Sequence, residues 1–169
     1  DALHGKSDLF FSWNTALGVN MAGVVGRSAF LSPVNLLFFL LVPRDAILPA
    51  MSFFLMLKLA LIALTAFVLL DRCFSRIPLF WKTALSLLYA YSGYVFQYYS
   101  NLHWLDTILL IPLILLGLHL LISREMPWLY LGTLTLCLVQ DLYLSFMVYL
   151  FLLTVGGLYF LLVLPAEKR

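Results

Sequence analysis

The sequence predicts an all-α fold, a polytopic transmembrane helical bundle with about five spanning helices and one short interfacial helix. Of the 169 residues, 64% are hydrophobic and 11% are charged, and the mean hydropathy is +1.04. Because soluble domains are about a quarter charged, a water-soluble enzyme or binding module is excluded. The apolar runs are continuous and do not alternate, which excludes the strands of an outer-membrane barrel.

The first part of the chain, residues 1–45, is predicted to be an external loop with a short interfacial or re-entrant helix. Residues 1–32 are polar and rich in glycine. The SPVNLLFFLLVP stretch then begins with Ser32 as N-cap and Pro33 at the first helical position, and it ends at Pro43. Its run of about ten apolar residues is too short to cross a bilayer.

Five longer apolar segments follow and make residues 46–169 a transmembrane helical bundle, as part of one larger membrane domain. Because the chain opens at Asp1 without an initiator methionine or a signal-peptide pattern, we expect an internal piece of a longer protein. The predicted spanning helices cover residues 46–70, 79–99, 104–122, 127–141 and 143–164.

Positive charge predicts the orientation of the bundle, since cytoplasmic loops are enriched in lysine and arginine. With residues 1–45 outside, the cytoplasmic side collects Arg72, Arg76, Lys82, Arg124, Lys168 and Arg169. The opposite orientation reverses this bias. The external side then holds Asp1, Asp8, Asp45, Asp106 and Asp141. Aspartates gathered there can bind a metal, act as a general base or hold sugar hydroxyls, or they can simply cap helices.

Lys58 is the strongest single indication of function, because it lies near the middle of the first spanning helix. An ammonium group at that depth is costly unless it is paired or hydrated. We predict that Lys58 faces the bundle interior and binds substrate, pairing with an aspartate or with a lipid-linked phosphate from the outer leaflet. A structural ion pair and a lysine that reaches to the interface are the alternatives.

A second polar group lies in YSGYVFQYYSNLHWLD, where the second spanning helix ends and the third begins. His103 and Asp106 are three residues apart and can share a helix face, and Asn101 lies just before them. Such a group can position a general base or orient a substrate hydroxyl. We predict that His103 and Asp106 are catalytic and that Asn101 binds substrate, whereas helix capping and an interfacial aromatic belt are the alternatives.

A third candidate, SWNTALGVN, lies in the external segment. Trp13 offers a flat face for stacking, and Asn14 and Asn20 offer both donors and acceptors of hydrogen bonds. Because a sugar presents an apolar face and a ring of hydroxyls, we predict that these three residues bind substrate. An interfacial tryptophan is the simpler alternative.

Several functional classes lack support in the sequence. It has no basic cluster of the kind that nucleic-acid binding requires. The spacing of Cys73 and Cys137 suits neither a metal site nor a disulfide framework, and no metal ligand is assigned. The motifs of hydrolases, nucleotide-driven pumps and zinc proteases do not occur.

The order of these motifs resembles the YfhO family of bacterial membrane proteins. The matching pieces cover nearly the whole chain, and the block from SNLHWLDT to PLILLG is the most specific of them. They are SWNTALGVN, SPVNLLFFLLVP, the lysine-bearing LMLKLALIALTAF, LLYAYSGYVFQYYSNLHWLDTILLIPLILLG and QDLYLSFMVYLFLL.

The resemblance implies a GT-C type glycosyltransferase. Members of the family look like multi-span enzymes that use a polyprenyl-phosphate sugar on the outer face of the cytoplasmic membrane. In Gram-positive relatives the family is associated with the addition of sugars to teichoic acids. An acidic residue of the first outer loop would activate the acceptor hydroxyl, often with a divalent metal. In the family this residue precedes SWN, so the main catalytic acid is expected upstream of Asp1. Gln140 and Asp141 stand where relatives tend to show Asn-Tyr.

The predicted function is therefore transfer of a sugar from a polyprenyl-phosphate donor to a cell-envelope glycan or teichoic acid acceptor, at the external face of the bacterial cytoplasmic membrane. The expected partners are membrane lipid, this donor and this acceptor. The alternatives are a secondary transporter or flippase for lipid-linked sugars and a non-catalytic membrane subunit. A transporter should show paired repeats with broken helices, and the sequence has no internal repeat.

Overall fold

The computed structural model describes residues 32–123 and 126–162, and every regular element in these ranges is a helix. This confirms the predicted all-α class for the described residues, whereas Trp13, Asn14 and Asn20 lie outside them. The elements are α2 (Pro33–Leu41), the 3₁₀ turn η3 (Arg44–Ala46), α3 (Ile47–Cys73), α4 (Leu79–Ala90), α5 (Gly93–Tyr98), α6 (Leu102–Ile122), α7 (Pro127–Gln140) and α8 (Leu142–Leu162).

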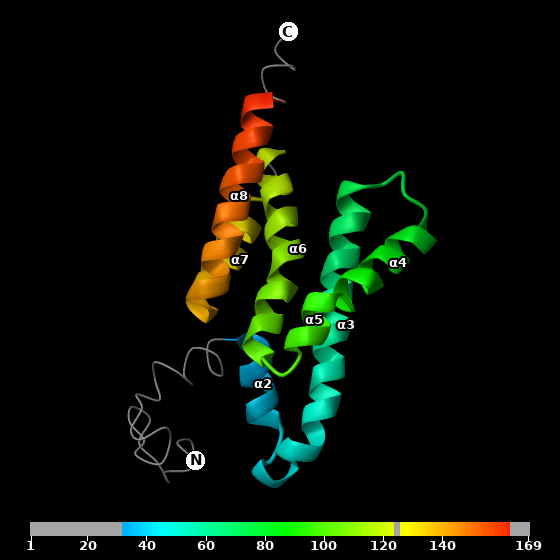
Figure 1. Cartoon of the computed structure of the whole chain (residues 1–169), viewed down its shortest axis with the longest axis vertical. Coiled ribbons are helices and arrows are strands. Elements are labelled where there is room, and N and C mark those ends of the chain that lie inside the picture. Colours follow the sequence, from blue (N-terminus) through cyan, green and yellow to red (C-terminus); the bar gives the residue numbers. More distant parts are fainter. Residues whose placement is uncertain (1–31, 124–125, 163–169) are drawn as a thin grey trace.

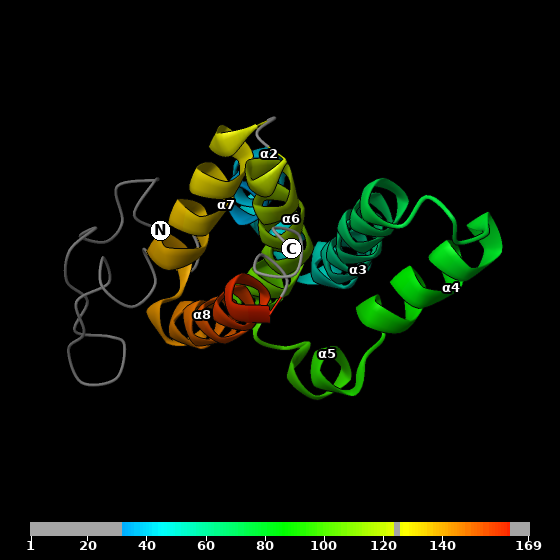
Figure 2. The same cartoon turned by 90° about the horizontal axis from the view of Figure 1, so that it is seen from above.

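Helix α6 is the centre of the arrangement. It packs against α3 on one side and against α7 and α8 on the other, and α4 lies on the far side of α3 (Figures 1 and 2). A buried cluster around Ile62, Ala90 and Leu105 joins α3, α4 and α6. A second cluster around Ile114 and Cys137 joins α6, α7 and α8. Both apolar faces of α6 are therefore covered by other helices.

Helix α2 begins and ends where the sequence predicts. The Ser32 hydroxyl accepts a hydrogen bond from the Asn35 backbone N–H at 3.3 Å, and Pro33 occupies the first helical position. Val42 is extended, as expected of a residue before proline, and the helix stops there. The Phe38 ring stacks on the Phe54 ring of α3, with centroids 4.0 Å apart.

The prediction of one helix over residues 79–99 is wrong. The chain forms α4 and α5 instead, because Ser92 adopts an extended conformation and Gly93 starts the second helix. Serine and glycine have low helix propensity, and the serine side chain competes with the backbone for hydrogen bonds. Because the residues around Ser92 and Gly93 are apolar, the hydrophobic pattern does not indicate the break between α4 and α5.

Pro112 lies inside α6 without ending it. Proline has no N–H group, so the Ile108 carbonyl one turn earlier loses its helical donor. The Tyr89 hydroxyl of α4 donates a hydrogen bond to this carbonyl at 2.8 Å. The proline thus creates a polar attachment point between α4 and α6.

Helix α4 turns its polar residues inward. Lys82 and Ser86 are buried against α3, and the Lys82 ammonium donates to the Asp71 carboxylate at 2.8 Å. Phe80 and Trp81 are exposed on the outer face. This polarity is the reverse of that of a helix on a soluble protein and suits apolar surroundings.

Two stretches of the described residues, Arg44–Cys73 and Leu102–Ile122, are long and apolar enough to cross a membrane. The stretch Leu142–Leu158 is apolar but shorter. A total of five spanning helices and a GT-C-like bundle therefore stay predictions.

Candidate functional site

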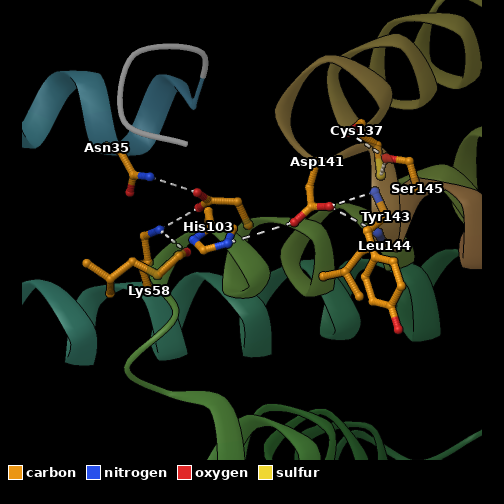
Figure 3. A network of polar contacts seen from close by, with 10 residues as sticks. Asn35, Lys58, His103, Cys137, Asp141, Tyr143, Leu144 and Ser145 are labelled. Atoms are coloured by element: carbon orange, nitrogen blue, oxygen red, sulfur yellow. Dashed lines mark hydrogen bonds and ion pairs between the residues drawn. The ribbon is translucent and has the colours of Figure 1, made fainter. Parts of the chain in front are cut away.

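A buried ion pair joins α3 to α6. The Lys58 Nζ lies 2.7 Å from Asp106 Oδ1, and the two side chains are only 1% and 4% exposed. The same ammonium group donates to the Leu102 carbonyl oxygen at 2.7 Å (Figure 3). Because a buried charge is tolerated when it is paired and hydrogen-bonded, these two contacts explain why a lysine occurs in the middle of an apolar helix.

Helix α2 completes this centre with an amide group. The Asn35 side-chain N–H₂ donates to Asp106 Oδ2 at 3.0 Å, so each carboxylate oxygen receives a donor (Figure 3). The Ser32 hydroxyl also interacts with the carboxylate. Asn35 is not among the site residues predicted from the sequence, since it is 71 residues from Asp106. Its polar side chain at the start of an otherwise apolar short helix is the feature that could have indicated a role in the site.

A second polar pair, more open than the first, lies beside it. His103 Nε2 is 4.0 Å from Asp141 Oδ2, and the side chains are 37% and 10% exposed (Figure 3). The other oxygen of Asp141 accepts hydrogen bonds from the backbone N–H groups of Tyr143 and Leu144 at 2.9 and 3.1 Å. Asp141 therefore caps α8 and faces His103 at the same time.

His103 and Asp106 have different partners and do not form one pair. Residues three apart on an α-helix point in directions that differ by roughly 60°. In α6 this difference turns Asp106 toward Lys58 and His103 toward Asp141. Asn101 directly precedes the helix, and its carbonyl oxygen accepts a hydrogen bond from the Trp104 N–H at 2.9 Å.

The two pairs differ in the chemistry that they can perform. The Lys58–Asp106 pair is sealed from solvent, so it can fix the relative position of three helices. The His103–Asp141 pair is accessible, and a carboxylate beside an imidazole can bind a hydroxyl group or accept its proton. The described residues contain no group of three or more His, Cys, Asp or Glu side chains that could hold a metal ion.

Comparison with known proteins identifies a protein family. The model of a family described as bacterial membrane protein YfhO matches residues 1–168 of the chain. No curated protein and no solved structure gives a significant match.

Proposed function

Because the chain belongs to the YfhO family of bacterial membrane proteins, we propose that it is part of a membrane glycosyltransferase. In this proposal the enzyme moves a sugar from a polyprenyl-phosphate donor to a hydroxyl of a cell-envelope acceptor such as teichoic acid. It acts at the external face of the bacterial cytoplasmic membrane. The observation that supports this most is the partly exposed His103–Asp141 pair, which lies beside the buried Lys58–Asp106 pair in an apolar helical bundle.

The His103–Asp141 pair is assigned to the acceptor. A sugar-transfer reaction needs an acceptor hydroxyl held close to the anomeric carbon, with its O–H bond polarised. His103 is exposed enough to receive such a hydroxyl, and Asp141 Oδ2 lies 4.0 Å from its Nε2, so a hydroxyl group can contact both side chains. As the new C–O bond forms, the bond between the anomeric carbon and the phosphate breaks, and the polyprenyl phosphate leaves with the bonding electrons. The proton of the acceptor hydroxyl passes to the His103 imidazole.

The Lys58–Asp106 pair is assigned to positioning. Lys58 binds the carbonyl of Leu102, the residue directly before His103, so α3 holds the first turn of α6 in place. Through this contact Lys58 fixes the backbone next to His103, although Lys58 itself is buried. The expectation that Lys58 binds the donor phosphate stays a prediction. In the conformation described here its ammonium group bonds to Asp106 and to Leu102.

The proposal is tested with purified full-length protein in lipid nanodiscs. The protein is incubated with a polyprenyl-phosphate sugar and an acceptor lipid extract, and mass spectrometry follows donor consumption and product formation. His103→Ala should abolish most of the turnover, whereas Asp45→Asn, an exposed carboxylate in η3, should leave it unchanged. Transport of intact donor across the bilayer without consumption would favour the flippase alternative and refute the proposal.

A further inference from the structure

Three aromatic side chains form a connected group at the start of α6. The Tyr94 and Tyr98 rings of α5 have centroids 4.9 Å apart, and the Tyr98 ring meets the Trp104 ring of α6 edge-on at 4.9 Å. All three side chains are partly buried. We call Tyr94, Tyr98 and Trp104 the aromatic cluster. It lies where α5 packs beside the first turns of α6 (Figure 1).

The aromatic cluster reaches the His103–Asp141 pair at both of its ends. The Trp104 ring lies edge-on to the His103 ring, with centroids 6.0 Å apart. At the other end, Tyr94 is within electrostatic reach of the Asp141 carboxylate. His103 Nε2 and Asp141 Oδ2 are themselves 4.0 Å apart. Three aromatic rings, one imidazole and one carboxylate thus make up a single partly exposed patch.

Other aromatic residues nearby have the character of an interfacial belt, and the aromatic cluster differs from them. Tyr91 and Tyr99 are 67% and 55% exposed, as expected of tyrosines at a membrane interface. Neither of these rings contacts another aromatic ring within residues 32–123 and 126–162. The rings of the aromatic cluster are more buried and contact one another and His103. A role as interfacial anchors therefore does not account for their arrangement.

The side chains of this patch match the chemistry of a sugar ring. A pyranose presents C–H groups that pack on aromatic rings, and it carries hydroxyl groups around its edge. An imidazole, a carboxylate and phenol hydroxyls can donate hydrogen bonds to such hydroxyls or accept them. A quaternary ammonium ion also binds to aromatic rings, but it offers no hydrogen-bonding atom. It would cover the imidazole and the phenols and leave them without partners, which is costly.

Charge in the patch favours a neutral sugar. None of its five side chains is a lysine or an arginine, and the Lys58 ammonium group nearby is buried and paired with Asp106. The Asp141 carboxylate repels a phosphate group at this position. A lipid-linked sugar would therefore bind here through its ring, with its phosphate outside the patch.

We propose that the aromatic cluster is a binding subsite for the pyranose ring of a neutral sugar. The ring packs on the Trp104 and Tyr98 side chains, and its hydroxyls bind the His103–Asp141 pair. This inference rests on the proposed function, which brings a sugar to His103. The transferred sugar and a sugar of the acceptor share this chemistry, and both lie next to the reacting oxygen atom.

Saturation-transfer NMR on the full-length protein in phosphatidylglycerol nanodiscs tests the subsite. The probes are the methyl glycosides of glucose, galactose and N-acetylglucosamine. Sorbitol, which has hydroxyls but no ring, and choline are the comparisons. Irradiation of aromatic protons excites the protein and not the lipid, and empty nanodiscs give the background. We expect transfer to at least one glycoside, strongest for the protons on one face of its ring, and background transfer to sorbitol and choline.

Matched variants locate the subsite. Trp104→Leu keeps an apolar side chain but removes the ring, and it should weaken glycoside binding roughly fivefold, as expected for the loss of one aromatic contact. Trp104→Phe keeps an aromatic face and should retain most of the binding. Tyr99→Leu removes an exposed tyrosine outside the aromatic cluster and should leave binding unchanged. The wild-type signal is selective for one face of the ring, so the test does not depend on the folding of a variant.

Displacement of the bound glycoside identifies the source of the sugar. Displacement by a polyprenyl-phosphate sugar assigns the subsite to the transferred sugar, whereas displacement by an acceptor glycan alone assigns it to the acceptor. Both results agree with a pyranose subsite.

The other outcomes separate this inference from the proposed function. Background transfer to all three glycosides, equal transfer to sorbitol, transfer to choline instead, or equal losses in Trp104→Leu and Tyr99→Leu would each overturn the subsite. The NMR measurement needs no turnover of a donor. A protein that consumes the donor but binds no glycoside refutes the subsite alone. One that binds glycoside through Trp104 but never consumes the donor refutes the transferase alone.

Discussion

The Lys58 ammonium group of α3 lies 2.7 Å from the Asp106 carboxylate of α6, and both side chains are almost completely buried. With Asn35 of α2 on the second carboxylate oxygen, three helices meet at one charged centre. A buried pair of this kind adds little net stability compared with apolar residues, but the loss of one partner is expensive. The pair therefore serves to fix how the helices around His103 are placed.

Removal of the lysine alone should destabilise the protein more than neutralisation of both partners. Lys58→Met is expected to cost about 3–5 kcal/mol, because Asp106 then keeps a buried charge without its ion-pair partner. The double variant Lys58→Met with Asp106→Asn should regain a large part of this loss. Unfolding midpoints in detergent measure both effects. A double variant less stable than Lys58→Met would show that the pair is not the main electrostatic contact at this position.

Gly117 should tolerate no side chain, because α6 and α7 cross closely there. A Cβ atom at this position would lie 2.7 Å from the backbone N and Cα atoms of Tyr130. We expect Gly117→Ala to cost about 1–3 kcal/mol, since a backbone segment has to move. Gly132→Ala is the matched control, because nothing lies within 4 Å of its added Cβ. Equal unfolding midpoints for the two variants would argue against this helix crossing.

The contact between Tyr89 and Ile108 should depend on Pro112. Tyr89→Phe leaves the Ile108 carbonyl without the donor seen here, at a cost of about 1–3 kcal/mol. In a Pro112→Ala background the helix regains its own N–H donor, so the same substitution should cost less. A double-mutant cycle on unfolding midpoints measures this coupling. Additive effects would show that the tyrosine does not compensate for the proline.

Long apolar runs and helix signals in the sequence predict most of the helices. The predicted segment 46–70 corresponds to α3, and 104–122 corresponds to α6. The Ser32 cap of α2 also follows from local sequence. These features depend on neighbouring residues alone, which is why a pattern along the chain is sufficient to find them.

The partners within the site depend on packing and were not predictable in the same way. The sequence leaves the partner of Lys58 open between an aspartate and a lipid-linked phosphate, and the structure shows a pair with Asp106. The choice of Asp141 for His103 follows from the meeting of α6 with the start of α8. These contacts join segments far apart in the chain, so periodicity gives no information about them.

We propose that the Lys58–Asp106 centre supports sugar transfer. The most direct test is the Asp106→Asn variant of the full-length protein, for which the rate of sugar transfer is measured per folded molecule. Membrane insertion and yield of folded protein are measured in the same preparations, with Asp45→Asn as the control. We expect normal insertion and a strong loss of transfer for Asp106→Asn, because His103 is no longer held in position. An unchanged rate of transfer per folded molecule would show that Asp106 is not part of the site, and it would contradict a role of the charged centre in sugar transfer.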